Sequence, residues 1–219
     1  MMIVVGAQKG GVGKSTLGLN LTVWRAHQPG HSKVLLIDTD AQGSGQLWVS
    51  IRTRQGIEPK ISCVIGQAGT IVDAIRALQG SFDDIVIDTK GDESTELGEV
   101  LEIADKVVTP LRPAMFDIAT LGYMEKLVKS KRMINPKLQA LVLANYAPSN
   151  KGNTKVPRMR RTVAEQYKGY RMLETAIVNR SLYDLCGERG KGVMELPKGT
   201  PGFAKACEEI EQLAQEVWA

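Results

Sequence analysis

The sequence contains few cysteines and lacks any long apolar run. Its three cysteines, Cys63, Cys186 and Cys207, are far apart, odd in number and in no metal-binding spacing. This pattern argues against a disulfide framework and against a zinc site, so we interpret the thiols as packing residues in a reducing cytosol. No apolar stretch approaches the roughly 18–20 residues that a membrane span needs, and the apolar start runs into a glycine-rich loop rather than a cleavage site. We therefore expect a soluble, cytoplasmic protein.

Internal repeats, low-complexity tracts and long linkers are also absent from the sequence. Of its 219 residues, 43% are hydrophobic and 24% are charged, a balance that excludes a disordered or collagen-like chain. A chain of this length can bury one sizeable core but not comfortably two. We expect a single domain that covers residues 1–219.

Charge is distributed unevenly along the chain. Residues 126–191 contain 15 Lys and Arg against 4 Asp and Glu, and residues 81–125 contain 3 against 11, although the formal net charge of the whole chain is only +4. The basic segment is a candidate surface for a polyanion such as DNA, and a set of solvated helix faces is the competing interpretation.

Short apolar runs alternate with stretches of helical period. We expect buried strands at residues 2–7, 33–39, 61–65, 84–88, 106–110 and 138–144. Helical period is found at residues 14–27, 71–78, 94–104, 117–129 and 202–218, and the last of these has an apolar stripe that predicts an amphipathic helix lying on the domain. Such alternation indicates βαβ units, and it predicts an α/β fold with a doubly wound, mostly parallel sheet and helices on both faces.

The stretch from Gln8 to Thr16, QKGGVGKST, has the composition and the position of a phosphate loop. It follows the first expected strand and opens the first expected helix, where backbone N–H groups and the helix dipole favour an anion. Lys14 would reach the β- and γ-phosphates, the Ser15 hydroxyl would ligate Mg²⁺, and Thr16 would lie near the α-phosphate. The expected nucleotide-binding residues are Gly10, Gly11, Val12, Gly13, Lys14, Ser15 and Thr16.

Two later strands end in carboxylates. The run at 33–39 ends in Asp38 and Thr39 and is followed by Asp40, and the run at 84–88 ends in Asp88. In a doubly wound sheet, these strand ends lie at the edge that also holds the phosphate loop. We expect Ser15, Asp38 and Asp88 to hold Mg²⁺, and Asp40 to orient the attacking water.

These motifs together resemble the ParA/MinD group of deviant-Walker ATPases, and within it the small ParA-type plasmid partition ATPases. Gln8 replaces the glycine of the strict Walker A pattern, and Lys9 followed by two glycines is typical of the deviant form. The likeness rests on KGGVGKST at 9–16, VLLIDTDAQGS at 34–44, FDDIVIDTKG at 82–91 and ADKVVTPLRPAMFDIATL at 104–121, with weaker matches at 141–148 and 176–196. It implies a P-loop NTPase fold and an ATPase that uses ATP and Mg²⁺.

The same resemblance implies a dimer. Lys9 would be the signature lysine that crosses an ATP-sandwich dimer to the partner's phosphates, and the expected catalytic residues are Lys9, Lys14 and Asp40. Asn145 matches a family position near the nucleotide base. Two departures from the family pattern are Ala41, where proline is usual, and Lys90, where proline or a small residue is usual.

ParA-type relatives bind DNA without sequence preference as ATP-bound dimers, and they release it when a DNA-binding adaptor protein stimulates hydrolysis. The resemblance therefore implies a protein that associates with the nucleoid when ATP is bound. The basic segment fits such binding, and its densest part supplies the candidate DNA contacts Lys151, Lys155, Arg158, Arg160, Arg161, Lys168 and Arg171.

Several alternatives share the nucleotide motifs. A MinD-like membrane switch ends in a basic amphipathic helix, whereas residues 202–218 carry four Glu against one Lys, which an anionic membrane would repel. A metabolic ATP-dependent enzyme of the dethiobiotin-synthetase-like class lacks the signature lysine. An iron–sulfur reductase is excluded because no cysteine lies between Cys63 and Cys186. Plasmid partition is our leading interpretation, with chromosome segregation, positioning of another cargo and conjugative DNA transfer as alternatives.

Overall fold

The computed structural model describes residues 1–91, 94–150 and 152–219. Within these residues one seven-stranded sheet has the order β3-β2-β4-β1-β5-β6-β7, and every neighbouring pair is parallel. The strands are β1 Met2–Val5, β2 Val34–Asp38, β3 Ser62–Ile65, β4 Asp84–Asp88, β5 Lys106–Leu111, β6 Gln139–Ala147 and β7 Arg171–Val178. The order reverses at β1, and a doubly wound sheet binds its ligands at such a switch point.

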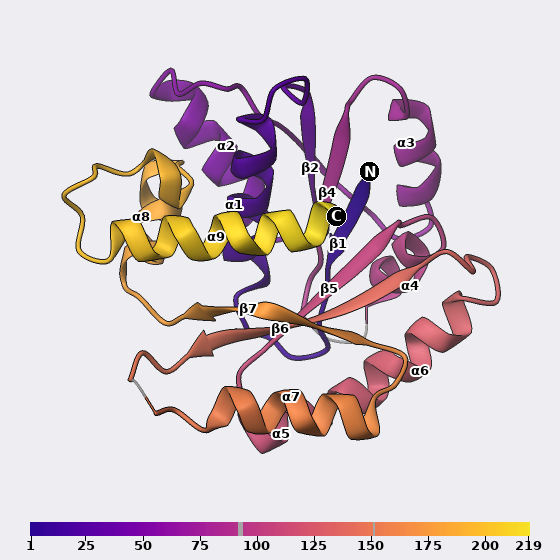
Figure 1. Cartoon of the computed structure of the whole chain (residues 1–219). Coiled ribbons are helices and arrows are strands. Elements are labelled where there is room, and N and C mark those ends of the chain that lie inside the picture. Colours follow the sequence, from indigo (N-terminus) through magenta and orange to yellow (C-terminus); the bar gives the residue numbers. More distant parts are fainter. Residues whose placement is uncertain (92–93, 151) are drawn as a thin grey trace.

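Helices cover both faces of the sheet (Figure 1). Those on the first face are α1 Lys14–Ala26, α2 Ser44–Arg54, α8 Leu182–Arg189, the 3₁₀ turn η1 Val193–Glu195 and α9 Phe203–Trp218. Those on the second face are α3 Ile71–Leu78, α4 Thr95–Leu101, α5 Met115–Ala119, α6 Leu121–Lys131 and α7 Lys155–Gln166.

Two apolar cores lie between the sheet and these helix layers. Along β1, Ile3 and Val5 point into the first core, and Met2 and Val4 point into the second. This alternation follows from the two-residue period of a strand, and burial of both faces explains why the central strands are continuous apolar runs. The expected α/β fold, with a doubly wound parallel sheet and helices on both faces, is confirmed.

The edges of the sheet differ from expectation. The run at 61–65 was expected to be buried on both faces, but Ser62 and Ile65 are exposed, because β3 is an edge strand that pairs with β2 alone. The opposite edge strand, β7, alternates buried and exposed residues and was not predicted. Polar residues interrupt β7, so it lacks the continuous apolar run by which the central strands were predicted.

Some elements begin or end at other residues than the sequence predicts. The segment expected to be one helix at 117–129 consists of α5 and α6, with Thr120 between them. Strand β6 extends to Ala147, three residues beyond the predicted 138–144. The amphipathic helix expected at 202–218 is present as α9, which packs across α1 and β7 through Ala206, Ile210, Leu213 and Val217 (Figure 1).

The three cysteines are free thiols. Burial raises the pKa of the Cys186 thiol to about 12, so it is an unreactive packing group at neutral pH. Among the described residues, no helix has both the length and the apolarity to cross a bilayer.

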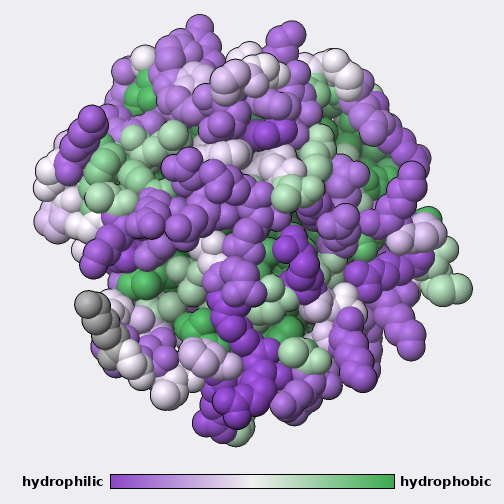
Figure 2. Space-filling view, viewed as in Figure 1, coloured by the Kyte–Doolittle hydropathy of each residue, from purple (hydrophilic) through white to green (hydrophobic). Residues whose placement is uncertain are grey.

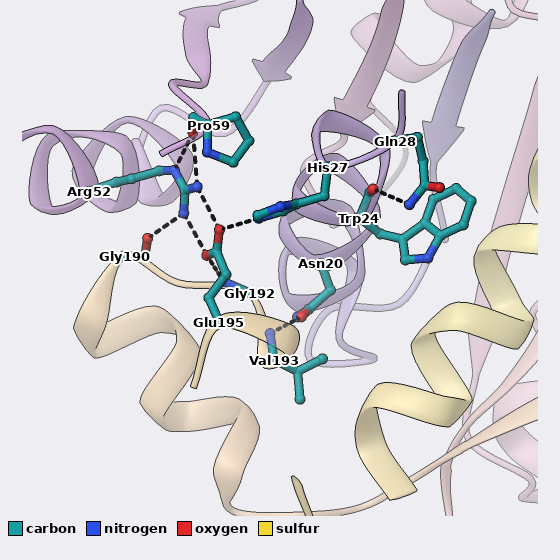
Figure 3. A network of polar contacts seen from close by, with 10 residues as sticks. All are labelled: Asn20, Trp24, His27, Gln28, Arg52, Pro59, Gly190, Gly192, Val193 and Glu195. Atoms are coloured by element: carbon teal, nitrogen blue, oxygen red, sulfur yellow. Dashed lines mark hydrogen bonds and ion pairs between the residues drawn. The ribbon is translucent and has the colours of Figure 1, made fainter. Parts of the chain in front are cut away.

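A buried ion-pair network joins three separate parts of the chain (Figure 3). The Arg52 guanidinium of α2 donates 2.7 Å hydrogen bonds to both carboxylate oxygens of Glu195, and it also donates to the carbonyls of Pro59 and Gly190. Nε2 of His27, just beyond α1, lies 2.8 Å from Glu195 Oε1. The side chain of Arg52 is 1% exposed, so its charge is compensated entirely by these partners. The network ties α1 and α2 to the segment that precedes α9.

A second buried carboxylate, Asp84 at the start of β4, gives a testable pH dependence. Burial alone would raise its pKa, but the 2.6 Å hydrogen bond from Arg25 and other positive charge outweigh that effect and lower the pKa below the usual value. A lowered pKa stabilises the fold at pH values above the unfolded pKa, near 4, and this contribution is lost as the pH falls further. We expect Asp84→Asn to lower the free energy of unfolding by about 2 kcal/mol at pH 7.

Urea unfolding of the wild type and of Asp84→Asn between pH 3 and pH 8 checks this expectation. The difference between the two proteins should be constant above pH 5 and should shrink as the pH falls below 4. A difference that is independent of pH would mean that the Asp84 charge contributes nothing. The exposed Asp73→Asn on α3 is the control, because its ion pair with Arg76 is at 3.7 Å on the surface.

Candidate nucleotide-binding site

The predicted phosphate loop lies between β1 and α1, at the switch point of the sheet. Gly11 and Gly13 have φ angles of 68° and 86°, in the left-handed region that favours glycine. A Cβ on Gly13 would lie 2.4 Å from Asn145 Nδ2, so no larger residue fits there. Gly13 is also the N-cap of α1 and has no side chain to occupy the first N–H groups of the helix. These groups can therefore bind an anion.

Lys14 is inside this site. Its side chain is buried, and Nζ donates a 3.3 Å hydrogen bond to the Lys9 carbonyl across the loop. Gly91, which follows β4, lies so close that a Cβ there would be 3.0 Å from the Gly10 Cα and 3.4 Å from Lys14 Nζ. The segment after β4 therefore packs directly against the loop. This contact places Lys14 beside the carboxylates that end the strands.

Asp88, at the end of β4, has one carboxylate oxygen without a hydrogen-bond partner among the described residues. Burial raises its pKa to about 7, a hydrogen bond with the Ser15 side chain opposes this shift, and the Asp38 charge adds to it. The Oδ1 atom is buried and has no hydrogen-bond partner among the described residues. A cation held between Ser15 and Asp88 would satisfy this oxygen, so these two residues fit the predicted Mg²⁺ ligands.

Asp38 is next to Asp88 in the sheet, but both of its carboxylate oxygens accept backbone hydrogen bonds. Its Oδ1 accepts the Asp40 N–H at 2.9 Å, and its Oδ2 accepts the Gly45 N–H at 2.7 Å. Asp38 thus shapes the turn that leads into α2, and this turn carries Asp40, whose Oδ1 accepts the Gln42 N–H at 3.0 Å. Across the described residues, no group of three or more His, Cys, Asp and Glu side chains could hold a metal ion.

The Lys9 side chain is bound by a residue of α5, outside the loop that contains it. Its Nζ lies 2.9 Å from Asp117 Oδ2 on α5, and its side chain is 44% exposed. Asp117 is buried, and its Oδ1 has no hydrogen-bond partner among the described residues. In the single chain, the predicted signature lysine is therefore held by a residue that the sequence did not single out.

The ends of β5 and β6 also contact the loop. Asn145 donates a 2.7 Å hydrogen bond to the Val12 carbonyl, and with Thr16 and Asn179 it borders a small pocket beside the loop. Arg112 and Tyr146 are not among the predicted site residues, although both follow predicted apolar runs and so belong to the same edge of the sheet as Asp38 and Asp88. Lys90, one of the two departures, is exposed, while its backbone N–H donates to Thr39 Oγ1 at 3.0 Å.

The candidate DNA contacts fall into separate places. Lys155, Arg158 and Arg161 are exposed on α7, where Figure 2 shows hydrophilic side chains gathered. Arg160 forms a 2.8 Å ion pair with Glu174. Lys168 and Arg171 lie at the start of β7, the opposite edge from the phosphate loop, and the Arg171 guanidinium donates to the Glu216 carbonyl at 3.2 Å. Lys151 lies outside the described residues.

Known proteins share both the sequence pattern and the fold. The protein named Maintenance of carboxysome distribution protein A from Halothiobacillus neapolitanus is 26% identical over 216 residues, which cover 98% of this chain and 95% of the relative. Protein ParA from Rhizobium radiobacter is 23% identical over 222 residues, covering 99% and 96%. Cobyrinic acid a,c-diamide synthase from Mycobacterium smegmatis, solved with an ATP analogue and magnesium, has a TM-score of 0.74 at 20% identity, covering 99% of this chain and 93% of that one.

The family match covers most of the chain and includes the site. It extends over residues 3–191, from β1 to the segment after α8. The phosphate loop, the strand-end carboxylates and Asn145 all lie within it. The resemblance predicted from the sequence is therefore confirmed: this chain belongs to the family described as the CobQ/CobB/MinD/ParA nucleotide binding domain.

Proposed function

We propose that this chain, as a single domain, is a Mg²⁺-dependent ATPase of the partition type, whose ATP-bound dimer binds DNA without sequence preference. An adaptor protein would stimulate hydrolysis and so release the DNA. One observation carries this proposal. The site contains two lysines, of which Lys14 is buried beside Asp88, whereas Lys9 is half-exposed and ion-paired with Asp117. This difference supports a role for Lys9 at the phosphates of a second chain rather than at those of its own chain.

Each site residue has a separate role in the proposed ATP hydrolysis. The loop N–H groups and Lys14 bind the phosphates, and Ser15 and Asp88 would hold Mg²⁺, which neutralises phosphate charge when bound. Asp38 orients the turn that presents Asp40. Asp40 would hold the attacking water in line, and the partner's signature lysine would stabilise the charge that develops on the transferred group.

The DNA surface that the structure favours is the exposed part of α7. Lys155, Arg158 and Arg161 are three residues apart and therefore share one side of the helix. The helix begins at the sheet edge where the strands end, which is the edge of the nucleotide site. DNA bound there would lie close to the nucleotide site, so we expect DNA binding to depend on ATP.

We expect the triple variant Lys155→Ala/Arg158→Ala/Arg161→Ala to bind DNA more weakly on all sequences. Each lost phosphate contact lowers the slope of log affinity against log salt concentration by ~0.9, so three contacts lower it by about 3. Fluorescence anisotropy with two unrelated duplexes, with and without ATP, measures both properties. Lys14→Ala should abolish the ATP-dependent part of the binding.

The matched control removes the same charge elsewhere. Lys126, Lys129 and Lys137 are exposed on and after α6, and their replacement by alanine should leave the salt slope unchanged. Equal losses from both triple variants would mean that DNA binding reflects only the total charge. Binding that is identical with and without ATP would overturn the proposed switch.

Plasmid DNA is the leading cargo, and a protein compartment is the second candidate. The latter is favoured by the relative named for carboxysome distribution, which matches over 98% of this chain. Identifying the adaptor that stimulates hydrolysis would distinguish between these two cargoes. A plasmid adaptor should bind a specific DNA site, whereas a compartment adaptor should bind the compartment shell.

A further inference from the structure

Two consecutive carbonyls of the phosphate loop accept hydrogen bonds from side chains of the neighbouring strands. Arg112, which follows β5, donates from Nη2 to the Gly11 carbonyl at 2.8 Å. Asn145, in β6, donates from Nδ2 to the Val12 carbonyl at 2.7 Å. Both donors come from the β5–β6 half of the sheet, while Asp38 and Asp88 come from the β2–β4 half. The loop is therefore held from the side opposite its carboxylates.

These two bonds fix the direction of the next two N–H groups. A peptide unit is planar and trans, so its C=O and the following N–H point in opposite directions. Since the Gly11 and Val12 carbonyls face β5 and β6, the N–H groups of Val12 and Gly13 point away from these strands. That direction leads toward the half of the site that holds Lys14 and Asp88, where the phosphates would be bound.

Arg112 is itself held in place by an aromatic ring. Its guanidinium carbon lies 4.9 Å from the centre of the Tyr146 ring, a cation–π distance. Tyr146 has a φ of 53°, the one non-glycine residue with positive φ among those described. A non-glycine residue in this conformation is strained, and such strain concentrates at functional sites. The Tyr146 ring also lies 3.2 Å from the position of a Cβ on Gly13, so it contacts the loop at a second point.

We propose that Arg112 is a positioning residue for the nucleotide phosphates. It acts through the Gly11 carbonyl, and Tyr146 holds its guanidinium in the required place. The Arg112 side chain is exposed, so the fold does not need it to fill a core. Its role is to direct the loop N–H groups before a nucleotide arrives, which lowers the reorganisation that binding requires. This role concerns the single chain and does not depend on DNA binding or on dimerisation.

Calorimetric titration with MgADP tests the proposal, because ADP occupies the loop without hydrolysis. We expect Arg112→Ala to raise the Kd for MgADP about tenfold, the typical effect of losing one charged hydrogen bond. Arg112→Lys should restore part of the affinity, since an ammonium can still donate to the carbonyl. Tyr146→Phe keeps the ring and should retain more affinity than Tyr146→Ala, which should weaken binding as Arg112→Ala does.

Three outcomes would overturn the proposal. One is that Arg112→Ala binds MgADP as tightly as the wild type. Another is that Arg112→Ala lowers the unfolding temperature of the nucleotide-free protein and loses affinity only to a matching extent. That result would indicate a purely structural effect. The last is that non-hydrolysable ATP analogues bind more weakly while MgADP does not, which would mean direct contact with the γ-phosphate. Arg76→Ala, which removes an exposed arginine from α3, is the matched control and should change nothing.

Discussion

Replacing Arg52 by alanine is expected to lower the free energy of unfolding by about 3–5 kcal/mol, the cost of breaking a buried ion pair by removing one partner. Arg52 is completely enclosed, and Glu195 would be left as a buried carboxylate without its main counter-charge. The carbonyls of Pro59 and Gly190 would also lose their donors (Figure 3). Urea or thermal unfolding at pH 7 measures the loss.

Two further variants show whether the loss arises from the pair. Arg54→Ala removes an exposed arginine from the same helix and should change stability by less than about 0.5 kcal/mol. The double variant Arg52→Met/Glu195→Leu removes both charges, and it should recover much of the stability that Arg52→Ala loses. If Arg52→Ala and Arg54→Ala were equally stable, the buried network would not matter for folding.

The loss of the Arg52 network should also disturb the nucleotide site. Asn20, on α1, accepts the Val193 N–H at 2.7 Å, so the segment that carries Glu195 is bonded to the helix that begins at the phosphate loop (Figure 3). Arg52 lies on α2, which starts just after the Asp40 turn. The network therefore fixes α1 and α2 relative to each other, and with them the two sides of the site.

Lys9→Ala should leave nucleotide binding nearly unchanged and should lower adaptor-stimulated hydrolysis by on the order of 10³-fold. The binding part follows from the structure, where Lys9 contacts Asp117 rather than the interior of the loop. The catalytic part follows from the proposed dimer, because a cation supplied by a second chain to a transferring phosphoryl group typically contributes 10³–10⁵-fold. Nucleotide titration and phosphate release measure the two parts separately.

Lys90→Ala is the control, because Lys90 is an exposed lysine at the same edge of the sheet. Retained hydrolysis in Lys9→Ala would contradict action across the dimer, and would favour a metabolic enzyme of the same fold. A mixed dimer sharpens the test. Lys9→Ala mixed with an Asp40→Ala chain should recover at most one working site per dimer, since each site takes Lys9 from one chain and Asp40 from the other.

The phosphate loop could be predicted from the sequence because its signals are local. Glycines, a lysine and a hydroxyl follow one another in a single stretch, and the helix that they open has a clear period. Asp38 and Asp88 could be proposed as site residues for a related reason, since the ends of buried apolar runs are visible without knowing which strands pair. The central strands were predicted well on the same basis, whereas the edge strands β3 and β7 lack a continuous apolar run.

The residues that hold the loop could not be predicted in the same way. Arg112 and Asp117 contact residues 101 and 108 positions earlier in the chain, and nothing in the local sequence distinguishes them from surface charges. Their partners become visible only when the order of the strands is known, because β5 is next to β1 in the sheet but not in the sequence. The separation of the basic residues between two ends of the sheet depended on the topology for the same reason.

The position of α9 has a practical consequence for how this protein is divided for study. The family match ends at residue 191, so a fragment cut there would retain every nucleotide motif. Yet α9 covers the apolar surface of α1 and β7, and Glu216 accepts the backbone N–H groups of Glu174 and Thr175. A trimmed fragment would present that surface to water and should aggregate when it is produced. Truncation guided by motifs alone would therefore remove the helix that covers this apolar surface.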